Sequence, residues 1–263
     1  MGDSGTSTVD DSDVRSGSAE TAGPEDGPAS TRGRTWRSRI TLTIGLAMML
    51  VGVSLLGYVG WQLYGTTYVS QKAQRELVDQ LEQDWAGGSA ASSGETLEAK
   101  AGDGKDTGPA ILRIPRLGSD YAVPILRGVD EETLTEGLGH FPKSAGPGEI
   151  GNYALAGHRI THGEPFRRLP ELRPGDKVIV DTRETRYVYR LLTNPNDLVV
   201  DFTQVWVVDP VPTNPSQGGV QPPQGKKQRL ITLTTCSELF HTDNRMIAFG
   251  ELMRTVDRAD LAS

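Results

Sequence analysis

A long apolar run, ITLTIGLAMMLVGVSLLGYVGWQLYG from Ile40 to Gly65, limits most strongly how this chain can fold. It contains no charged side chain, and about 20 apolar residues are enough to span the hydrocarbon core of a bilayer. Because positive charge stays on the cytoplasmic side, the basic residues just before the run set its direction. These residues are Arg32, Arg34, Arg37 and Arg39. We therefore expect a single-pass membrane anchor over 40–65, with a cytoplasmic N-terminus and the rest of the chain outside the cell.

Two other interpretations of the apolar run are weaker. A buried core helix would show an amphipathic pattern, and this run is too long and too rich in glycine. A cleaved signal peptide has a shorter apolar region close to the N-terminus, followed by a small-residue cleavage site. This run begins only at Ile40 and has no clear A-x-A site after it. Trp61, Tyr64 and Tyr68 also fit an aromatic belt at the outer membrane interface.

The segments on either side of the anchor are mostly polar. Residues 1–39 contain little that could be buried, so we expect a disordered cytoplasmic tail. Residues 66–108 are predicted to form a juxtamembrane helix over 68–85, followed by a flexible linker rich in Gly and Ser. The net charge of −7 provides no basic surface, which argues against nucleic acid as a partner.

From Pro109 onward, short β-like runs alternate with turn residues. One helix is predicted at 130–139, with Asp130 as its N-cap and a glycine as its stop. Several short strands at this spacing predict an all-β domain, either a barrel or a sandwich. The runs are 110–117, 121–127, 151–158, 177–182, 185–193, 204–208, 229–235 and 245–252. We expect the domain to occupy 109–255, to fold without the preceding segments, and to end in a short tail over 256–263.

The chain has one cysteine, Cys236, at the end of the apolar run TLTTC. It therefore has no internal disulfide, and a lone thiol outside the cell is a liability unless it is buried or useful. Strand ends that open into loops are where scaffolds present reactive groups. The residue types leave two interpretations open, a nucleophile and a buried inert cysteine.

A thiol nucleophile needs a neighbouring group that accepts and donates protons. Among the four histidines, His158 stands out because it also ends an apolar strand-like run, ALAGHR. His140 lies in a Gly/Pro-rich turn and fits a structural role, while His162 and His241 lie in polar segments. Arg245 begins the run after Cys236, where antiparallel pairing would bring it close to the thiol. Its guanidinium would stabilise an oxyanion or hold a substrate carbonyl; the alternative is an ordinary surface arginine.

Other kinds of site receive less support. We predict no metal site, on the ground that one cysteine and four scattered histidines lack metal-ligand spacing. No G-x-S-x-G segment supports a serine hydrolase.

The motifs around these residues resemble those of the sortases, the cysteine transpeptidases of Gram-positive cell surfaces. TLTTC (232–236) matches the family's TLxTC signature, and LAGHR (155–159) matches its histidine segment. The strand of Arg245 follows at the family's short spacing. A longer block at 137–159 looks like that of classes D and E. The segments 158–180 and 203–212 look most like class E, the housekeeping type of actinobacteria. The resemblance covers about residues 110–254.

This resemblance implies a closed eight-stranded barrel with short helices, and a specific chemistry. Cys236 would attack the Thr–Gly carbonyl of an LAxTG-like C-terminal sorting signal and form an acyl-enzyme. His158 would protonate the leaving amine and deprotonate the incoming one, and Arg245 would stabilise the oxyanion. The acceptor would be an amine of a peptidoglycan precursor, so the implied partners are that amine, the membrane, and secreted proteins bearing sorting signals. No cofactor is implied.

The long connection 194–228, rich in proline and carrying the apolar segment QVWVV, is expected to help form the groove for the signal. We predict substrate contacts from Thr235, Val205 and Trp206. One departure from class E is visible after the cysteine, where Glu238 and His241 replace the usual proline and serine.

Three alternatives to a wall-anchoring sortase remain. The first is a sortase that polymerises pilins, with a lysine as acceptor. The second is another cell-surface enzyme with a cysteine nucleophile. An L,D-transpeptidase would carry an S-x-G-C-type segment, which TLTTC is not, while a cysteine peptidase stays open. The third is an anchored β-barrel that binds a partner and has a buried, inert cysteine.

Overall fold

The computed structural model describes residues 32–61, 65–87, 109–236 and 243–261. Most of the predicted tail and linker, together with Tyr64, Glu238 and His241, lie outside these residues. The chain separates into two compact units, Met1–Ser54 and Leu55–Ser263. In the part of the chain that is described, the segment Arg39–Gly60 of helix α1 (Arg32–Gly60) is the one helix long and apolar enough to cross a membrane.

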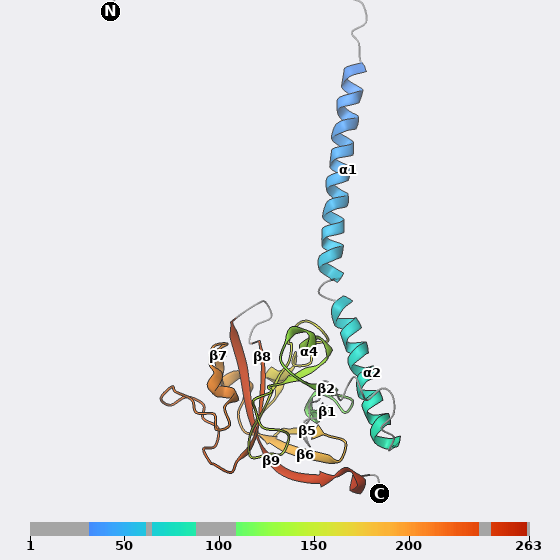
Figure 1. Cartoon of the computed structure of the whole chain (residues 1–263). Coiled ribbons are helices and arrows are strands. Elements are labelled where there is room, and N and C mark those ends of the chain that lie inside the picture. The colour runs from blue at the N-terminus through green and yellow to red at the C-terminus, as the bar shows by residue number, and fades with distance from the viewer. Residues whose placement is uncertain (1–31, 62–64, 88–108, 237–242, 262–263) are drawn as a thin grey trace, which may run out of the picture. The chain divides into compact units, whose positions relative to one another are not determined.

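The second unit contains a β-barrel closed by eight strands (Figure 1). The strands follow the order β6-β5-β1-β2-β3-β4-β8-β9, and pairing of β6 with β9 closes the ring. Their bounds are β1 Ala110–Arg113, β2 Ala122–Arg127, β3 Leu138–His140, β4 Gly151–Ala156, β5 Lys177–Asp181, β6 Thr185–Leu191, β8 Arg229–Cys236 and β9 Asn244–Asp257. A further strand, β7 (Val199–Asp201), pairs with the beginning of β9. The expectation of a closed eight-stranded, all-β barrel is confirmed.

Two of the strand pairs are parallel, β2 with β3 and β4 with β8. Parallel neighbours need a crossover connection instead of a hairpin. The connection from β4 to β8 includes the barrel strands β5 and β6 and the additional strand β7. The register of β4 with β8 pairs Ala154 with Thr232 and Ala156 with Thr234. Both strands consequently end at the same rim of the barrel.

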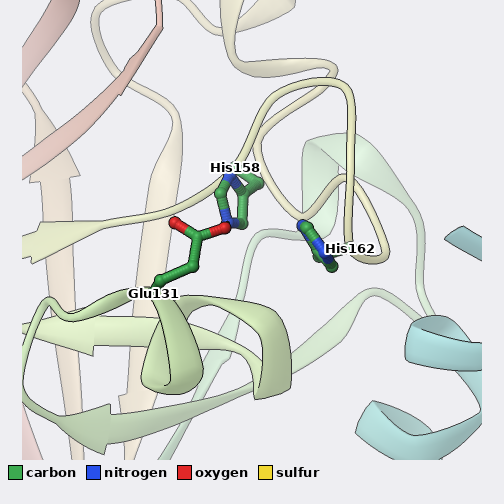
Figure 2. A group of neighbouring side chains, drawn as sticks. All are labelled: Glu131, His158 and His162. Atoms are coloured by element: carbon green, nitrogen blue, oxygen red, sulfur yellow. The ribbon is translucent and has the colours of Figure 1, made fainter. Parts of the chain in front are cut away.

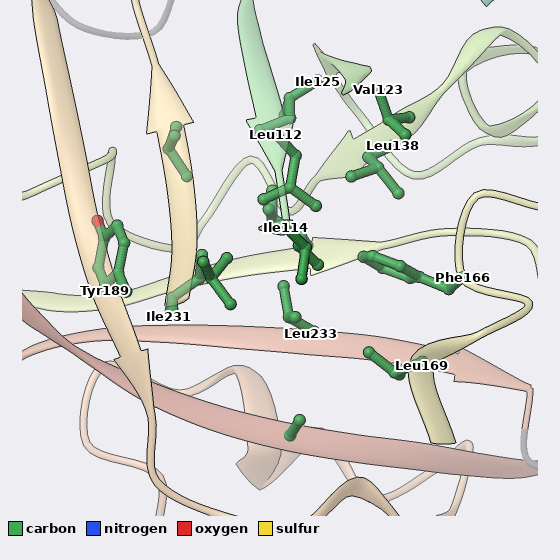
Figure 3. Packing of buried hydrophobic residues seen from close by; sticks show 14 of the residues in the cluster. Leu112, Ile114, Val123, Ile125, Leu138, Phe166, Leu169, Tyr189, Ile231 and Leu233 are labelled. Atoms are coloured by element: carbon green, nitrogen blue, oxygen red, sulfur yellow. The ribbon is translucent and has the colours of Figure 1, made fainter. Parts of the chain in front are cut away.

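The barrel interior is filled by large apolar side chains from nearly every strand (Figure 3). Leu112 and Leu233 are fully buried there, and Phe166 closes one side from a loop. Full burial of one such side chain contributes about 1.5–3 kcal/mol to stability. The residues labelled in Figure 3 are Leu112, Ile114, Val123, Ile125, Leu138, Phe166, Leu169, Tyr189, Ile231 and Leu233. This core fixes the rim on which the chemistry-bearing residues lie.

Short helical segments interrupt the strands, and two of them differ from the sequence prediction. Helix α4 (Glu131–Glu136) forms as expected, because the Asp130 carboxylate accepts a hydrogen bond from the Thr133 amide at 3.0 Å. The predicted strand 110–117 is wrong in its second half, since Pro115 begins the 3₁₀ turn η2 (Pro115–Leu117). The apolar segment 204–208 forms the 3₁₀ helix η5 (Val205–Val208) instead of a strand. The remaining 3₁₀ turns are η3 Leu169–Glu171, η4 Pro195–Asp197 and η6 Arg258–Leu261.

The helix predicted over 68–85 is present as α2 (Thr66–Gly87), and it packs against the barrel (Figure 1). Val78 and Leu81 are buried against Ile111 of β1. Val78, Leu81 and Ile111 therefore form a small hydrophobic cluster between α2 and the barrel.

Polar contacts strengthen the packing of α2 against the barrel. Glu82 forms an ion pair with Arg113 of β1. The guanidinium of Arg258 lies 4.8 Å from the centre of the Trp85 ring, which is within the range of a cation–π contact. The expectation of a domain that begins near Pro109 and folds without the preceding segments thus leaves out an element that the barrel contacts directly.

Candidate active site

Strand order brings the three predicted catalytic residues to one rim of the barrel. Strand β8 lies between β4 and β9. Cys236, the last residue of β8, stands directly opposite Arg245 in the antiparallel ladder. His158 follows two residues after Ala156, where β4 ends beside Thr234 of β8. The cysteine is thus flanked in the sheet by the histidine strand on one side and the arginine strand on the other.

Two hydrogen bonds fix the end of β4 to β8. The Gly157 amide donates to the Thr234 carbonyl at 3.1 Å, and the Thr235 hydroxyl donates to the Gly157 carbonyl at 2.8 Å. The residue just before His158 is therefore held by the two residues just before Cys236. Thr235, predicted to bind substrate, uses its hydroxyl for this internal contact.

A cleft of about 650 Å³ opens at this rim. Its lining includes Glu131, His158, His162, Val205, Thr235 and Arg245. Val205 is 67% exposed, so it offers an apolar surface to a ligand. Trp206 does not share this position. Its ring packs against Phe249, with 6.2 Å between ring centres, in a separate hydrophobic cluster. The prediction that Trp206 contacts substrate receives no support from this placement.

The imidazole of His158 lies between a carboxylate and a second imidazole (Figure 2). Glu131 Oε1 is 3.9 Å from His158 Nε2, and the ring of His162 is 4.9 Å away between centres. Burial lowers the pKa of His158, and the neighbouring His162 lowers it further, while Glu131 opposes both effects. The neutral imidazole, which accepts a proton, is therefore favoured near neutral pH.

The loop after His158 has an unusual backbone that side chains from outside the loop hold in place. His162, Gly163 and Glu164 have φ angles of 52°, 85° and 53°, a region that is costly for residues other than glycine. Gln74 of α2 donates to the His162 carbonyl at 3.0 Å, and Gln71 donates to the Gly163 carbonyl at 3.2 Å. Helix α2 thus helps to shape the segment that carries His162 and adjoins His158.

The same loop is held at its far end. The Tyr121 hydroxyl donates to the Pro165 carbonyl at 2.6 Å, and the Phe166 amide donates to the His158 carbonyl at 3.0 Å. The loop is therefore a closed structure, with Phe166 buried in the barrel core at its base.

Arg245 occupies a different kind of place. It pairs in the sheet with Cys236 of β8 on one side and Val200 of β7 on the other. Its Nη1 donates to the Asn244 carbonyl at 3.1 Å. The pKa of Asp201 is lowered mainly by hydrogen bonds from Thr203, with a smaller contribution from Arg245. The guanidinium therefore adds positive charge to the cleft beside the end of the cysteine strand.

The remaining described histidine outside the cleft, His140, has a structural environment. Its Nε2 lies 3.0 Å from the Ala145 carbonyl oxygen, and its ring contacts Tyr153 at 4.8 Å between centres. Burial lowers the pKa of His140. The expectation that His140 holds a turn together agrees with these contacts.

Comparison with known proteins identifies the family. The family profile described as the sortase domain matches residues 112–253. The chain belongs to the sortase family. Two curated relatives support the predicted likeness to class E, both from Streptomyces coelicolor. Sortase SrtE1 is 35% identical over 228 residues, which is 82% of this chain and 58% of the relative. Sortase SrtE2 is 28% identical over 252 residues, which is 90% of this chain and 92% of the relative.

Comparison with solved structures also finds sortases. The structure of sortase E from Streptomyces avermitilis is 38% identical, with a TM-score of 0.49, and the match covers 57% of this chain and 91% of that one. The crystal structure of Sortase E1 from Streptomyces coelicolor, with a tripeptide in the active site, is 36% identical, with a TM-score of 0.48. That match covers 57% of this chain and 91% of the other. This sortase spans only 58% of the length of SrtE1, its first curated relative above.

Sequence reasoning missed two residues of the cleft, Glu131 and His162. The statement that the histidines lack metal-ligand spacing was wrong, because HRITH (158–162) places two histidines four residues apart. That spacing is one signal for a shared metal ion. Glu131 carried no such signal, since its approach to His158 depends on how α4 packs against β2 and β3 (Figure 2). Glu131, His158 and His162 are the described residues best placed to hold a cation.

Proposed function

We propose that this chain is a membrane-anchored cysteine transpeptidase with Cys236 as nucleophile, His158 as acid–base residue and Arg245 as oxyanion-stabilising residue. The observation that supports the proposal is the position of β8 between β4 and β9. Cys236 ends β8 between the strand that leads to His158 and the strand that carries Arg245, and both His158 and Arg245 line the cleft. The resemblance of TLTTC and LAGHR to the sortase motifs supports the same assignment.

The proposed chemistry has two halves. The Cys236 sulfur attacks the carbonyl carbon of threonine in the sorting signal, while His158 takes the thiol proton. The C–N bond to glycine then breaks, and His158 gives that proton to the leaving amine. An incoming amine attacks the thioester and transfers its proton to His158. The released Cys236 thiolate then takes this proton from His158. Arg245 stabilises the negative charge on the carbonyl oxygen in both halves. The lowered pKa of His158 suits this cycle, since it begins with a neutral imidazole.

The proposed location follows from α1. Its apolar segment is long enough to span a bilayer, and arginines precede it. With the N-terminus in the cytoplasm, the catalytic domain lies outside the cell, where secreted proteins bearing sorting signals and peptidoglycan amines are available. The aromatic residues Trp61 and Tyr68 are 64% and 72% exposed, which suits contact with the outer interface of the membrane.

We further propose an LAxTG-like signal as the substrate. Val205 and Phe202 line the cleft and are both more than half exposed, so they offer an apolar surface for Leu and Ala side chains. The test exchanges residues 202–212 for the matching segment of an LPxTG-preferring sortase. We expect the ratio of kcat/KM for LAxTG and LPxTG peptides to move toward LPxTG. An active variant with an unchanged ratio would mean that this segment does not read the signal.

The deciding experiment uses the full chain in detergent, an LAxTG-bearing peptide and an amine that imitates the peptidoglycan acceptor. Mass spectrometry should detect a peptide joined to the amine through threonine, and a thioester on Cys236 when the amine is omitted. The control is Cys236→Ala, which removes the nucleophile with little change in volume and should form neither species. Transpeptidation by a folded Cys236→Ala protein would contradict the proposal.

A further inference from the structure

Three potential metal ligands meet at the edge of the cleft, namely the Glu131 carboxylate and the imidazoles of His158 and His162 (Figure 2). One ligand atom from each residue lies within 4.8 Å of the other two. Glu131 comes from α4 and the two histidines from the loop after β4, so the fold brings the carboxylate to the imidazoles. Two histidines and one carboxylate match zinc sites that have three protein ligands and one open position.

One ring nitrogen of each histidine in this group has no hydrogen-bond partner in the described part of the chain. His158 Nε2 and His162 Nδ1 are both buried, and neither has a hydrogen-bond partner among the residues that the structure describes. Buried polar atoms are nearly always paired, so an unpaired one calls for an explanation such as an ion. Here two unpaired nitrogens occur on neighbouring rings beside a carboxylate. That combination points to a shared ligand.

The distances require only a modest adjustment to hold an ion. Around a tetrahedral Zn²⁺ with bonds of about 2.0–2.2 Å, ligand atoms lie about 3.3–3.6 Å apart. The Glu131 to His158 distance is already 3.9 Å. The Glu131 side chain is 76% exposed, so it can rotate inward without disturbing the core. On the other side, the hydrogen bond from Gln74 holds the backbone of His162 in place.

We propose that Glu131, His158 and His162 form a binding site for a divalent transition-metal ion, best matched by Zn²⁺, and that the bound ion inhibits transpeptidation. Imidazole nitrogen suits Zn²⁺, whereas Mg²⁺ and Ca²⁺ prefer oxygen ligands. The inhibitory part rests on the proposed function, in which His158 transfers protons. A His158 lone pair bonded to a metal ion is not available to accept a proton.

The binding test uses the full chain in detergent, stripped of metal with EDTA and then dialysed. It is done in a Cys236→Ala background, so that the thiol does not contribute a ligand. Calorimetry with ZnCl₂ should give one ion per chain, and MgCl₂ and CaCl₂ should give no comparable signal. His162→Phe keeps a flat ring but removes both nitrogens, and Glu131→Gln removes the charge. Each should weaken Zn²⁺ binding by about 10-fold or more.

The matched control is Glu132→Gln, because Glu132 is the exposed neighbour of Glu131 on α4 and is outside the group. It should bind Zn²⁺ as the parent does. Circular dichroism confirms that each variant is folded. Equal affinity in the parent and His162→Phe, or no binding by a folded parent, would overturn the proposal.

Inhibition is measured separately, with Cys236 present. Each protein is assayed in EDTA and in a series of buffered Zn²⁺ concentrations, and its activity is expressed relative to its own value in EDTA. We expect His162→Phe to need about 10-fold more Zn²⁺ for half-inhibition than wild type. A chain that binds Zn²⁺ through these residues but has no transpeptidase activity would support the site and contradict the proposed function. Equal inhibition of both proteins would overturn the regulatory part.

Discussion

The two sides of the cleft are held in place by different kinds of structure. The arginine side, defined here as Val200, Asp201 and Arg245, consists of paired strands. Arg245 has a ladder partner on each flank, so strand pairing sets the position of its backbone. The histidine side, defined as residues 157–166 with Glu131, is a loop next to the short helix α4. Side chains from α2 and that of Tyr121, just before β2, hold it.

This difference shows that the barrel positions one half of the site and an added helix helps to position the other half. Strand pairing is a local consequence of the sheet, whereas the left-handed backbone at His162–Glu164 needs partners to offset its conformational cost. Substitutions in α2 should therefore alter the geometry of the histidine side more than that of the arginine side.

The largest expected effect is the loss of the imidazole itself. His158→Ala should lower kcat/KM by about 10²–10⁴-fold, because a positioned acid–base residue contributes that much. The comparison is His140→Ala, which removes a buried ring with a structural hydrogen bond. It should lower the melting temperature while the activity of the folded fraction is retained. Similar losses of kcat/KM per folded molecule in both variants would mean that His158 is not the acid–base residue.

The next effect comes from removing α2. A fragment beginning at Pro109 should be less stable than one beginning at Thr66 by ~3 kcal/mol or more, since Val78 and Leu81 are each buried against Ile111. Denaturant unfolding of the two fragments measures the difference. We expect the shorter fragment also to lose activity, because the carbonyls of His162 and Gly163 lose their donors. Equal stability and equal kcat/KM would show that the barrel needs no help from α2.

A test of the arginine side is Arg245→Lys. Lysine keeps the positive charge but loses the planar group that donates several hydrogen bonds, so kcat should fall by about 10-fold or more. The control is Arg254→Lys at the exposed far part of the same strand. Its kcat should match wild type. Full activity of Arg245→Lys would reduce the role of Arg245 to that of a general positive charge.

The smallest expected effect separates the two sides most directly. The double variant Gln71→Ala and Gln74→Ala removes the two hydrogen bonds from α2 to the histidine loop. Each hydrogen bond contributes about 0.5–1.5 kcal/mol to stability, so kcat should fall by several-fold. The arginine side should be unchanged, so Arg245 should still be needed for acyl-enzyme formation. The control double variant, Gln80→Ala and Gln83→Ala, changes exposed residues of the same helix. If both double variants have wild-type kcat, the loop does not depend on these contacts.

Much of the fold was predictable because it depends on local signals. Asp130 and the glycine after Glu136 define α4 in the sequence, and the structure has the helix between them. Strands β4, β5, β6, β8 and β9 lie within or around the predicted runs. The three-residue strands β3 and β7 were not predicted, because strands that short have too few residues to show a period. Closure of the barrel came from the family resemblance, since the pattern alone allowed a sandwich.

The site was predictable only in part, because only some of its residues are marked by local sequence signals. Cys236, His158 and Arg245 each lie at a strand end, which the sequence marks. Glu131 reaches His158 through packing of α4, and Gln74 reaches His162 across 88 positions in the sequence. No periodicity or motif in a sequence indicates contacts between residues so far apart in the chain. The packing of α2 was missed because a few apolar residues in a polar helix suit either a free helix or one that covers a small patch.

The parallel pairing of β4 with β8 also determines when the site can exist. Strands β8 and β9 are the last two in the sequence, and they bring Cys236 and Arg245 and complete the ring through pairing with β6. Pairings between distant parts of a chain form slowly, because the intervening segment must be closed first. In a chain that emerges from its N-terminus onward, β4 and His158 therefore appear before β8 and Cys236, the proposed nucleophile. A chain that lacks β8 and β9 cannot form the proposed site. Cys236 is held beside the end of the histidine strand only after both last strands have been added to the barrel.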